Sequence, residues 1–220
     1  MESSRINFPV EVEKKVNELI SAYIRAELAY YTLAGKAASD KATLLNTARY
    51  YQARAQQLNQ TRTQMAHYQT FRGAIPQFNE DSMKSLQSAQ KPQSAEEMRQ
   101  EMKRAVEIEH ELEEKLRELI EEAESRKDSV TVRFTEKQLY RFQTPLTKQV
   151  IRPYNHQQQA KCMIAFDEMT MRREAEEKLE EVHEYHQMKF KQNFPRQFCE
   201  KHWRLSQRQL FEQSNRGLQQ

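Results

Sequence analysis

Apolar side chains recur at steps of three and four residues along the first part of the chain. One such run begins at Val12 and ends at Leu33, and a second begins at Leu44 and passes through Met65. Steps of three and four place side chains on one face of an α-helix, so both runs predict amphipathic helices that bury this face. The second helix is expected to end near Gly73.

A connection rich in Ser, Gln and Asn spans residues 74–93 and separates the second helix from a third. Its length implies a crossover from one end of a helical bundle to the other. Ser94 followed by Glu97 has the spacing of a capping box, in which the two side chains bond backbone N–H groups at a helix start. The third helix then carries a seam over residues 98–123 that is apolar except at Glu109.

A fourth helix is predicted over residues 129–151, with Gln143 at a seam position. Pro145 lies inside this helix and removes a backbone donor, which predicts a kink. Pro153 is expected to close the helix. Its apolar seam residues are Val132, Leu139, Leu146 and Val150.

Residues 154–192 predict a fifth helix, long and highly charged, which Pro195 should break before a short basic helix that carries Trp203. The predicted fold class is therefore all-α: a four-helix bundle over residues 8–152 and a helical, charged extension over residues 153–220. Four amphipathic helices make a complete core, so the bundle is expected to fold alone. The extension has weaker apolar periodicity, so it is expected to need a contact for its order.

Composition supports helices and an intracellular protein. The chain has only 3 Gly and 6 Pro, and 30 % of its residues are charged, as in proteins built of long helices. It begins without a signal-peptide pattern, and no apolar stretch has the length that a membrane span needs. Cys162 and Cys199 are the only cysteines, which favours free thiols in a reducing compartment. We therefore predict a cytoplasmic location, and the cytoskeleton and a cilium stay open as more specific locations.

The order of these elements resembles the ferritin family. Ferritins have four helices, a short first connection and one long crossover between the second and third helices. The resemblance covers about residues 8–152 and implies a ferritin-like bundle whose interior oxidises iron at a carboxylate-rich site. The residues that match in register include Val16, Asn17, Tyr30, Asn46, Ala48, Arg49, Tyr50, Arg72, Gly73, Lys91, Pro92, Ala105, Glu109, Phe134, Glu136 and Gln143.

The resemblance also implies that most of the iron ligands are missing. A di-iron site in a bundle needs several carboxylates and a Glu-x-x-His pair. Tyr23 stands at the first-helix glutamate position, and Leu58 and Thr61 stand at the glutamate and histidine positions of the second helix. Residues 41–79 contain no Asp or Glu at all, so this conclusion does not depend on the exact alignment. Three residues of the usual ligand set remain: Tyr30, Glu109 and Gln143.

We therefore predict a chain that is not an enzyme and has no catalytic, cofactor-binding or metal-binding residues. Glu109 can be interpreted as a remnant ligand or as a buried carboxylate that hydrogen bonds stabilise, and we favour the second. A buried carboxylate needs such partners, and the candidates are Tyr30, Tyr23 and Arg62.

Two Glu-x-x-His spacings, Glu107/His110 and Glu180/His183 with His186 beyond the second, could in principle bind Zn²⁺. Glutamate-rich helices produce such spacings freely, so we interpret them as surface residues. Glu107 and His110 flank the seam residue Glu109 and are therefore expected to point outward.

Assembly into a 24-subunit cage is also doubtful, although a homo-oligomer stays open. A long polar helix replaces the short fifth helix that lines the four-fold axis of a ferritin cage. The acidic pair of the three-fold pores is reduced to Glu136, with Arg133 in the other position, and an arginine repels cations.

Charge is unevenly distributed along the chain. Glutamates crowd the third helix. The C-terminal region is basic and interleaved with aromatic residues, Trp203 among them, which suits an acidic protein partner. A solvated tail, or one folded back on its own bundle, is the alternative. The arginines of the second helix, which has no acidic residue, are Arg49, Arg54, Arg62 and Arg72.

Two functional hypotheses follow. The first is a ferritin-like pseudoenzyme, a structural or interaction protein that docks on a larger assembly such as a microtubule or axoneme. The second is a subunit of iron-storage cages without ferroxidase activity. No membrane partner is expected, and the glutamate-rich third helix argues against nucleic acid.

Overall fold

The computed structural model describes residues 7–77, 92 and 94–193, with side chains up to Glu184. The chain divides into two compact units, Met1–Lys178 and Leu179–Gln220. The arrangement described below is that of the first unit.

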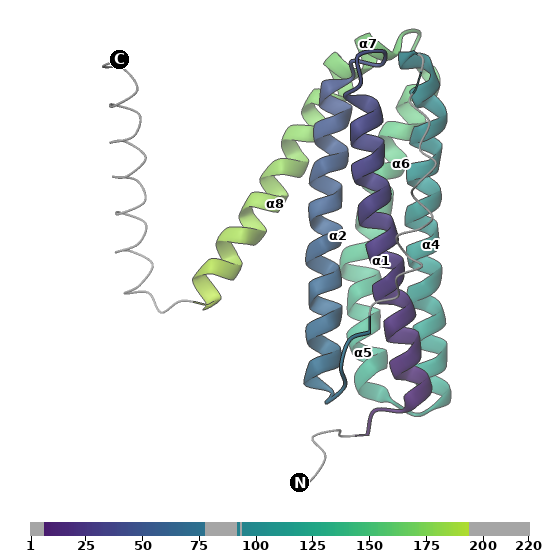
Figure 1. Cartoon of the computed structure of the whole chain (residues 1–220), viewed down its shortest axis with the longest axis vertical. Helices are drawn as coiled ribbons and strands as arrows, with labels where there is room; N and C mark the ends of the chain where they lie inside the picture. The colour runs from purple at the N-terminus through teal and green to yellow at the C-terminus, as the bar shows by residue number, and fades with distance from the viewer. Residues whose placement is uncertain (1–6, 78–91, 93, 194–220) are drawn as a thin grey trace, which may run out of the picture. The chain divides into compact units, whose positions relative to one another are not determined.

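Four long helical stretches make the bundle (Figure 1). The second and third of them run in the same direction, so the connection between them crosses the length of the bundle, as expected. The helices are α1 (Val10–Ala37), α2 (Leu45–Phe71) and α4 (Met98–Ser125), and the fourth stretch consists of α5 (Ser129–Gln138), the π-helical turn η2 (Leu139–Gln143) and α6 (Thr144–Gln159).

The predicted seams of the first three helices are confirmed. Every seam position of α4 is buried, Glu109 included. The seam of α1 is buried from Val12 to Leu33, and that of α2 from Leu44 to Met65 except at Arg62, which is partly exposed. Before α4, the 3₁₀ turn η1 (Ala95–Glu97) replaces the predicted capping box, because the Ser94 side chain caps no backbone N–H.

The seam of the fourth stretch is more polar than predicted. Val132 and Leu146 are only partly buried, whereas Leu139 and Val150 are fully buried. The π-helical turn inserts one residue into the helical repeat and so changes which side chains face the core. The buried polar residues of this stretch are Thr131, Thr135, Gln138, Gln143, Thr147 and Gln157.

Pro153 does not end the fourth helix, so that prediction is wrong. The helix α6 continues through Pro153 to Gln159. A proline has no N–H, so it leaves the carbonyl four residues earlier, that of Gln149, without its helical donor. The Tyr50 hydroxyl of α2 donates to this carbonyl at 3.1 Å and replaces the missing bond. Pro145 lies in the first turn of α6, directly after the π-helical turn.

The predicted single helix over residues 154–192 is also wrong, because the chain breaks after α6. An extended connection at Ala160 and Cys162 leads to α7 (Met163–Phe166), the π-helical turn η3 (Asp167–Met171) and α8 (Arg172–Asn193). The predicted break at Pro195 and the basic helix with Trp203 lie outside the described residues.

The start of the extension completes the bundle. Met163, Phe166, Met171 and Ala175 are buried in the same hydrophobic core as the four long helices. At the end of the bundle where α2 begins (Figure 1), the carboxylate of Asp167 takes the place of an N-cap.

The residue before α2 is Leu44, whose side chain cannot accept a hydrogen bond. Asp167 accepts hydrogen bonds from the backbone N–H of Asn46 at 3.0 Å and of Thr47 at 2.7 Å, and from the Thr47 hydroxyl at 2.6 Å. A carboxylate here satisfies unpaired N–H groups and complements the positive end of the helix dipole. The predicted boundary at residue 152 stays a prediction, but the contacts place residues up to Lys178 with the bundle.

Candidate functional site

Glu109 lies halfway along α4 at the centre of the bundle and is 0 % exposed. Each of the other three helical stretches directs one donor to its carboxylate. The Tyr30 hydroxyl of α1 donates to Oε1 at 2.6 Å, and the Gln143 amide of η2 donates to Oε2 at 2.6 Å. The π-helical turn therefore carries the one donor that comes from the fourth helix.

The third donor is Arg54 of α2, which is also 0 % exposed. Its Nε donates to Glu109 Oε1 at 2.8 Å and its Nη2 donates to Oε2 at 2.7 Å. This bidentate geometry is the strongest form of carboxylate–guanidinium contact. One positive and one negative charge therefore neutralise each other in the middle of the core.

The surroundings fix the charge state of each group. Burial would raise the pKa of Glu109, but the charge and hydrogen bonds of Arg54, Tyr30 and Gln143 hold that pKa below its ordinary value. Burial would lower the pKa of Arg54, and Glu109 raises it above its ordinary value instead. Burial, and then the Glu109 charge, raise the pKa of Tyr30. At neutral pH the site therefore holds a guanidinium, a carboxylate and neutral phenols.

The predictions for Glu109 are confirmed in part. Its burial and its bond to Tyr30 are confirmed. Arg62 is not a partner, since its Nε donates to Glu27 at 3.2 Å. Tyr23 is buried, but its hydroxyl has no hydrogen-bond partner among the described residues.

Sequence reasoning missed Arg54 as the partner of Glu109. The available signal was the second buried face of α2, on which Tyr50 and Gln57 lie beside the seam residues Leu58 and Tyr51. Arg54 lies four residues before Leu58, the position where ferritins place a glutamate ligand, and so belongs to the same part of the core.

These residues do not fit a pair of iron ions. The guanidinium of Arg54 already contacts both oxygens of the one carboxylate that remains of the ferritin ligand set. Leu58 is fully buried and offers no donor atom. The Thr61 hydroxyl donates to the Gln57 carbonyl at 3.1 Å instead of facing Glu109. A cation next to Arg54 would meet like charge in the buried core.

The two Glu-x-x-His spacings lie on surfaces. Glu107 and His110 are exposed, as predicted, and so are Glu180 and His183. The side chain of His186 lies outside the described ones. Over the described part of the chain, no three His, Cys, Asp or Glu side chains come together as a metal site would require.

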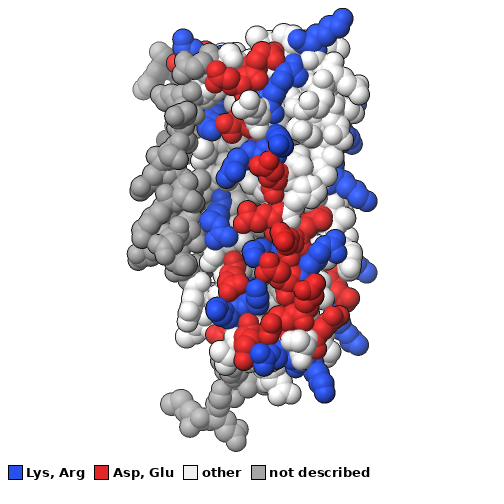
Figure 2. All heavy atoms as spheres, turned by 90° about the vertical axis from the view of Figure 1, so that its right-hand side faces the viewer, with Lys and Arg blue, Asp and Glu red and all other residues white. Residues whose placement is uncertain are grey.

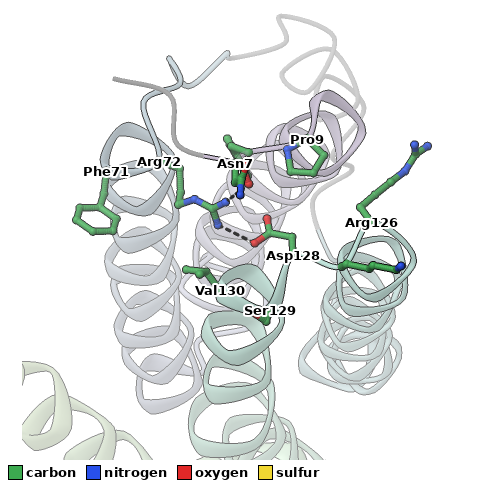
Figure 3. Close-up of a pocket in the computed structure, with 10 residues that line it drawn as sticks. Asn7, Pro9, Phe71, Arg72, Arg126, Asp128, Ser129 and Val130 are labelled. Atoms are coloured by element: carbon green, nitrogen blue, oxygen red, sulfur yellow. Dashed lines mark hydrogen bonds and ion pairs between the residues drawn. The ribbon is translucent and has the colours of Figure 1, made fainter. Parts of the chain in front are cut away.

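A second buried arginine, Arg72, directly follows the last residue of α2 (Figure 3). Arg72 donates to Asp128 Oδ1 at 3.1 Å and to the Asn7 carbonyl at 2.6 Å, beneath a surface depression of about 850 Å³. Burial would raise the pKa of Asp128, but its bonds with Thr131 and Arg72 lower it. Asp128 also accepts from the Thr131 N–H and so caps α5.

The arginines of α2 are therefore mostly internal. Arg54 and Arg72 are buried with carboxylates, and Arg62 pairs with Glu27 on α1. Arg49 is exposed. Three of the four arginines of this region thus pair with carboxylates of the bundle.

Comparison with protein families agrees with this architecture. The family model described as a ferritin-like domain matches residues 13–144, which covers most of the four-helix bundle. The search of curated protein sequences gives no match. Among the described residues, no helix is long and apolar enough to cross a membrane. The order of the helices, their buried seams and the family match together establish that this chain belongs to the ferritin family.

Proposed function

We propose that this chain is a non-catalytic ferritin-like scaffold, whose bundle has lost iron chemistry and whose C-terminal arm docks on an acidic protein assembly. The observation that carries the first part is the buried ion pair of Arg54 and Glu109. A guanidinium supplies the positive charge that a buried carboxylate needs, and it does so without a metal. The ion pair therefore stabilises the bundle at the position where active ferritins bind iron.

The first test is iron oxidation. Fe²⁺ added in air to the purified chain is expected to oxidise at the rate of buffer alone, followed by absorbance of the ferric product. The reason is that Arg54 holds both oxygens of Glu109 and that the described residues include no cluster of His, Cys, Asp and Glu side chains that could hold a metal ion. A saturable rate that disappears in the Glu109→Ala variant would refute this part of the proposal.

The second part rests on the sequence of the C-terminal region. Its many basic residues would attract an acidic partner over a long range. Aromatic residues interleaved with them, Trp203 among them, supply the apolar contact area that anchors such interfaces. A cytoskeletal filament with an acidic surface, the microtubule first, is the partner class that we propose.

Co-sedimentation with purified microtubules tests this docking. The double variant Arg204→Glu/Arg208→Glu is expected to bind at least about tenfold more weakly, because reversal of two charges lowers the net charge of the arm by four units. Its melting temperature should stay close to that of the wild type. The matched control Lys41→Glu/Arg49→Glu reverses the same charge at exposed residues of the bundle and should bind as the wild type does.

Equal loss of binding in both variants would show a non-specific attraction and contradict a docking arm. The alternative, a cage subunit without ferroxidase activity, predicts elution as a very large particle in size-exclusion chromatography.

A further inference from the structure

The outer face of the fourth helical stretch carries a row of exposed basic side chains, here called the basic stripe: Arg133, Lys137, Arg141 and Lys148. Between Ser129 and Gln159 the only acidic residue is Glu136. The four side chains form no ion pair among the described residues. Two aromatic side chains lie beside them, Tyr140 at 59 % and Phe142 at 42 % exposure.

The neighbouring helix α4 has the opposite character. Its outer face exposes Glu107, Glu114 and Glu121, which recur every seventh residue and so lie in one row. Figure 2 views this face and shows acidic residues concentrated over its lower half, with basic residues between them. Along the right-hand edge of the same view, on the side of α5 and α6, basic side chains project one after another.

The two rows have matching length and spacing. Seven residues of α-helix rise about 10.5 Å, so the three glutamates of α4 are spaced at about that interval. Arg133, Arg141 and Lys148 are separated by eight and seven residues, which gives nearly the same interval on the basic stripe. Three charges of each sign can therefore meet when the two helices lie along each other.

We propose that a second copy of this chain docks here, with the acidic row of α4 in one copy against the basic stripe of the next. The two rows lie on different faces of the same bundle, so the contact is heterologous: each copy that binds leaves both kinds of row free at the ends of the assembly. Copies thus add in a series, and this goes beyond the proposed docking of the C-terminal arm. Tyr140, exposed between the charges, supplies the apolar contact at the centre of the interface.

Ion pairs within α4 leave the glutamates of the acidic row available to a partner. Glu107 contacts Lys103 at 3.8 Å, and both side chains are more than half exposed, so water and salt screen this pair. Glu114 and Glu121 form no ion pair among the described residues. A partner with basic residues can therefore engage all three.

Sedimentation velocity of the full chain tests the proposal. At about 20 mM NaCl the wild type is expected to form a concentration-dependent series of oligomers, and at about 300 mM NaCl these should dissociate, because salt screens exposed charge pairs. A stripe variant changes Arg133, Arg141 and Lys148 to Gln, and a row variant changes Glu107, Glu114 and Glu121 to Gln, so each variant loses one set of charges and gains none of the opposite sign. Each variant alone is expected to self-associate at least about tenfold more weakly than the wild type.

The mixture of the two variants gives the decisive reading. The intact acidic row of the stripe variant should bind the intact basic stripe of the row variant, so the mixture is expected to form a one-to-one dimer and nothing larger. Far-ultraviolet circular dichroism checks that both variants stay folded. A wild type that is monomeric at every salt concentration, self-association that survives in either variant alone, or a mixture that stays monomeric would each overturn the proposal. Loss of arm docking in the Arg204→Glu/Arg208→Glu variant leaves it unaffected.

Discussion

Replacing Glu109 by alanine is expected to lower the free energy of unfolding by about 3–5 kcal/mol, the usual cost of breaking a buried ion pair by removing one partner. The variant leaves the Arg54 guanidinium charged and unpaired in the core. Arg54→Ala should cost a similar amount, because it leaves the Glu109 carboxylate with only Tyr30 and Gln143 as donors. Urea unfolding followed by circular dichroism measures both.

The structure changes the expectation for the conservative variant. From the seam pattern alone, Glu109→Gln should be tolerated well, since an amide keeps most hydrogen bonds of a carboxylate. With Arg54 in contact, the same variant still leaves an unpaired guanidinium, so it should be destabilising by more than about 2 kcal/mol. The matched double variant Arg54→Met/Glu109→Gln removes both charges and keeps an acceptor for Tyr30. It should be more stable than either Arg54→Met or Glu109→Gln alone, and additive losses would contradict a coupled pair.

Acid provides an independent check on the same pair. The folded-state pKa of Glu109 lies below its ordinary value of 4.5, so the stability it contributes is present above that pH and is lost as the pH falls through the lower folded-state value. Wild-type stability should therefore fall below about pH 4.5 more steeply than that of Arg54→Met/Glu109→Gln. Parallel pH profiles for the two proteins would show that Glu109 does not titrate in this way.

Truncation after Ile151 is expected to abolish cooperative folding, in contrast to a truncation after Glu184. The shorter fragment loses the buried side chains of Met163, Phe166 and Met171 and the Asp167 cap. Burial of three such apolar side chains contributes about 5–8 kcal/mol, which is comparable to the whole stability of a typical domain. The longer fragment retains all residues of the first compact unit, so its thermal transition should lie near that of the full chain.

Point variants of Asp167 separate the cap from the core contacts. Asp167→Ala is expected to cost about 2 kcal/mol, because two N–H groups at the start of α2 lose their acceptor in a buried place. Asp167→Asn keeps one acceptor oxygen and should cost less.

A fragment of residues 1–151 with a cooperative transition like that of the full chain would contradict the truncation prediction. It would show that the extension packs on a bundle that is already complete.

The sequence periodicity of the first three helices was sufficient to predict their buried faces, because each helix has a long run of apolar residues at helical spacing. It also placed Glu109 in the core, since its neighbours at steps of three and four are apolar. Missing ligands at Tyr23, Leu58 and Thr61 could be identified from the ferritin resemblance alone. None of these conclusions requires knowledge of which side chain faces which.

The fourth helix shows where sequence patterns fail. Its buried side chains are largely Thr and Gln, which a hydropathy pattern assigns to the surface. Partners on other helices satisfy two of them: Thr131 bonds the Tyr68 hydroxyl, and Gln143 bonds Glu109. The π-helical turn, which brings Gln143 to Glu109, leaves no mark in the periodicity over so few residues.

Tertiary contacts likewise decided the outcome at Pro153, Arg54 and Asp167. A proline ends a helix when nothing replaces its lost hydrogen bond, and here Tyr50 replaces it. An arginine or aspartate in a polar stretch is assigned to the surface unless a buried partner of opposite character is known. The partner of Arg54 is Glu109, 55 residues away, and a partner of Asp167 is Asn46, 121 residues away. Sequence determines which groups need partners; only the packing of distant helices determines which partner each one finds.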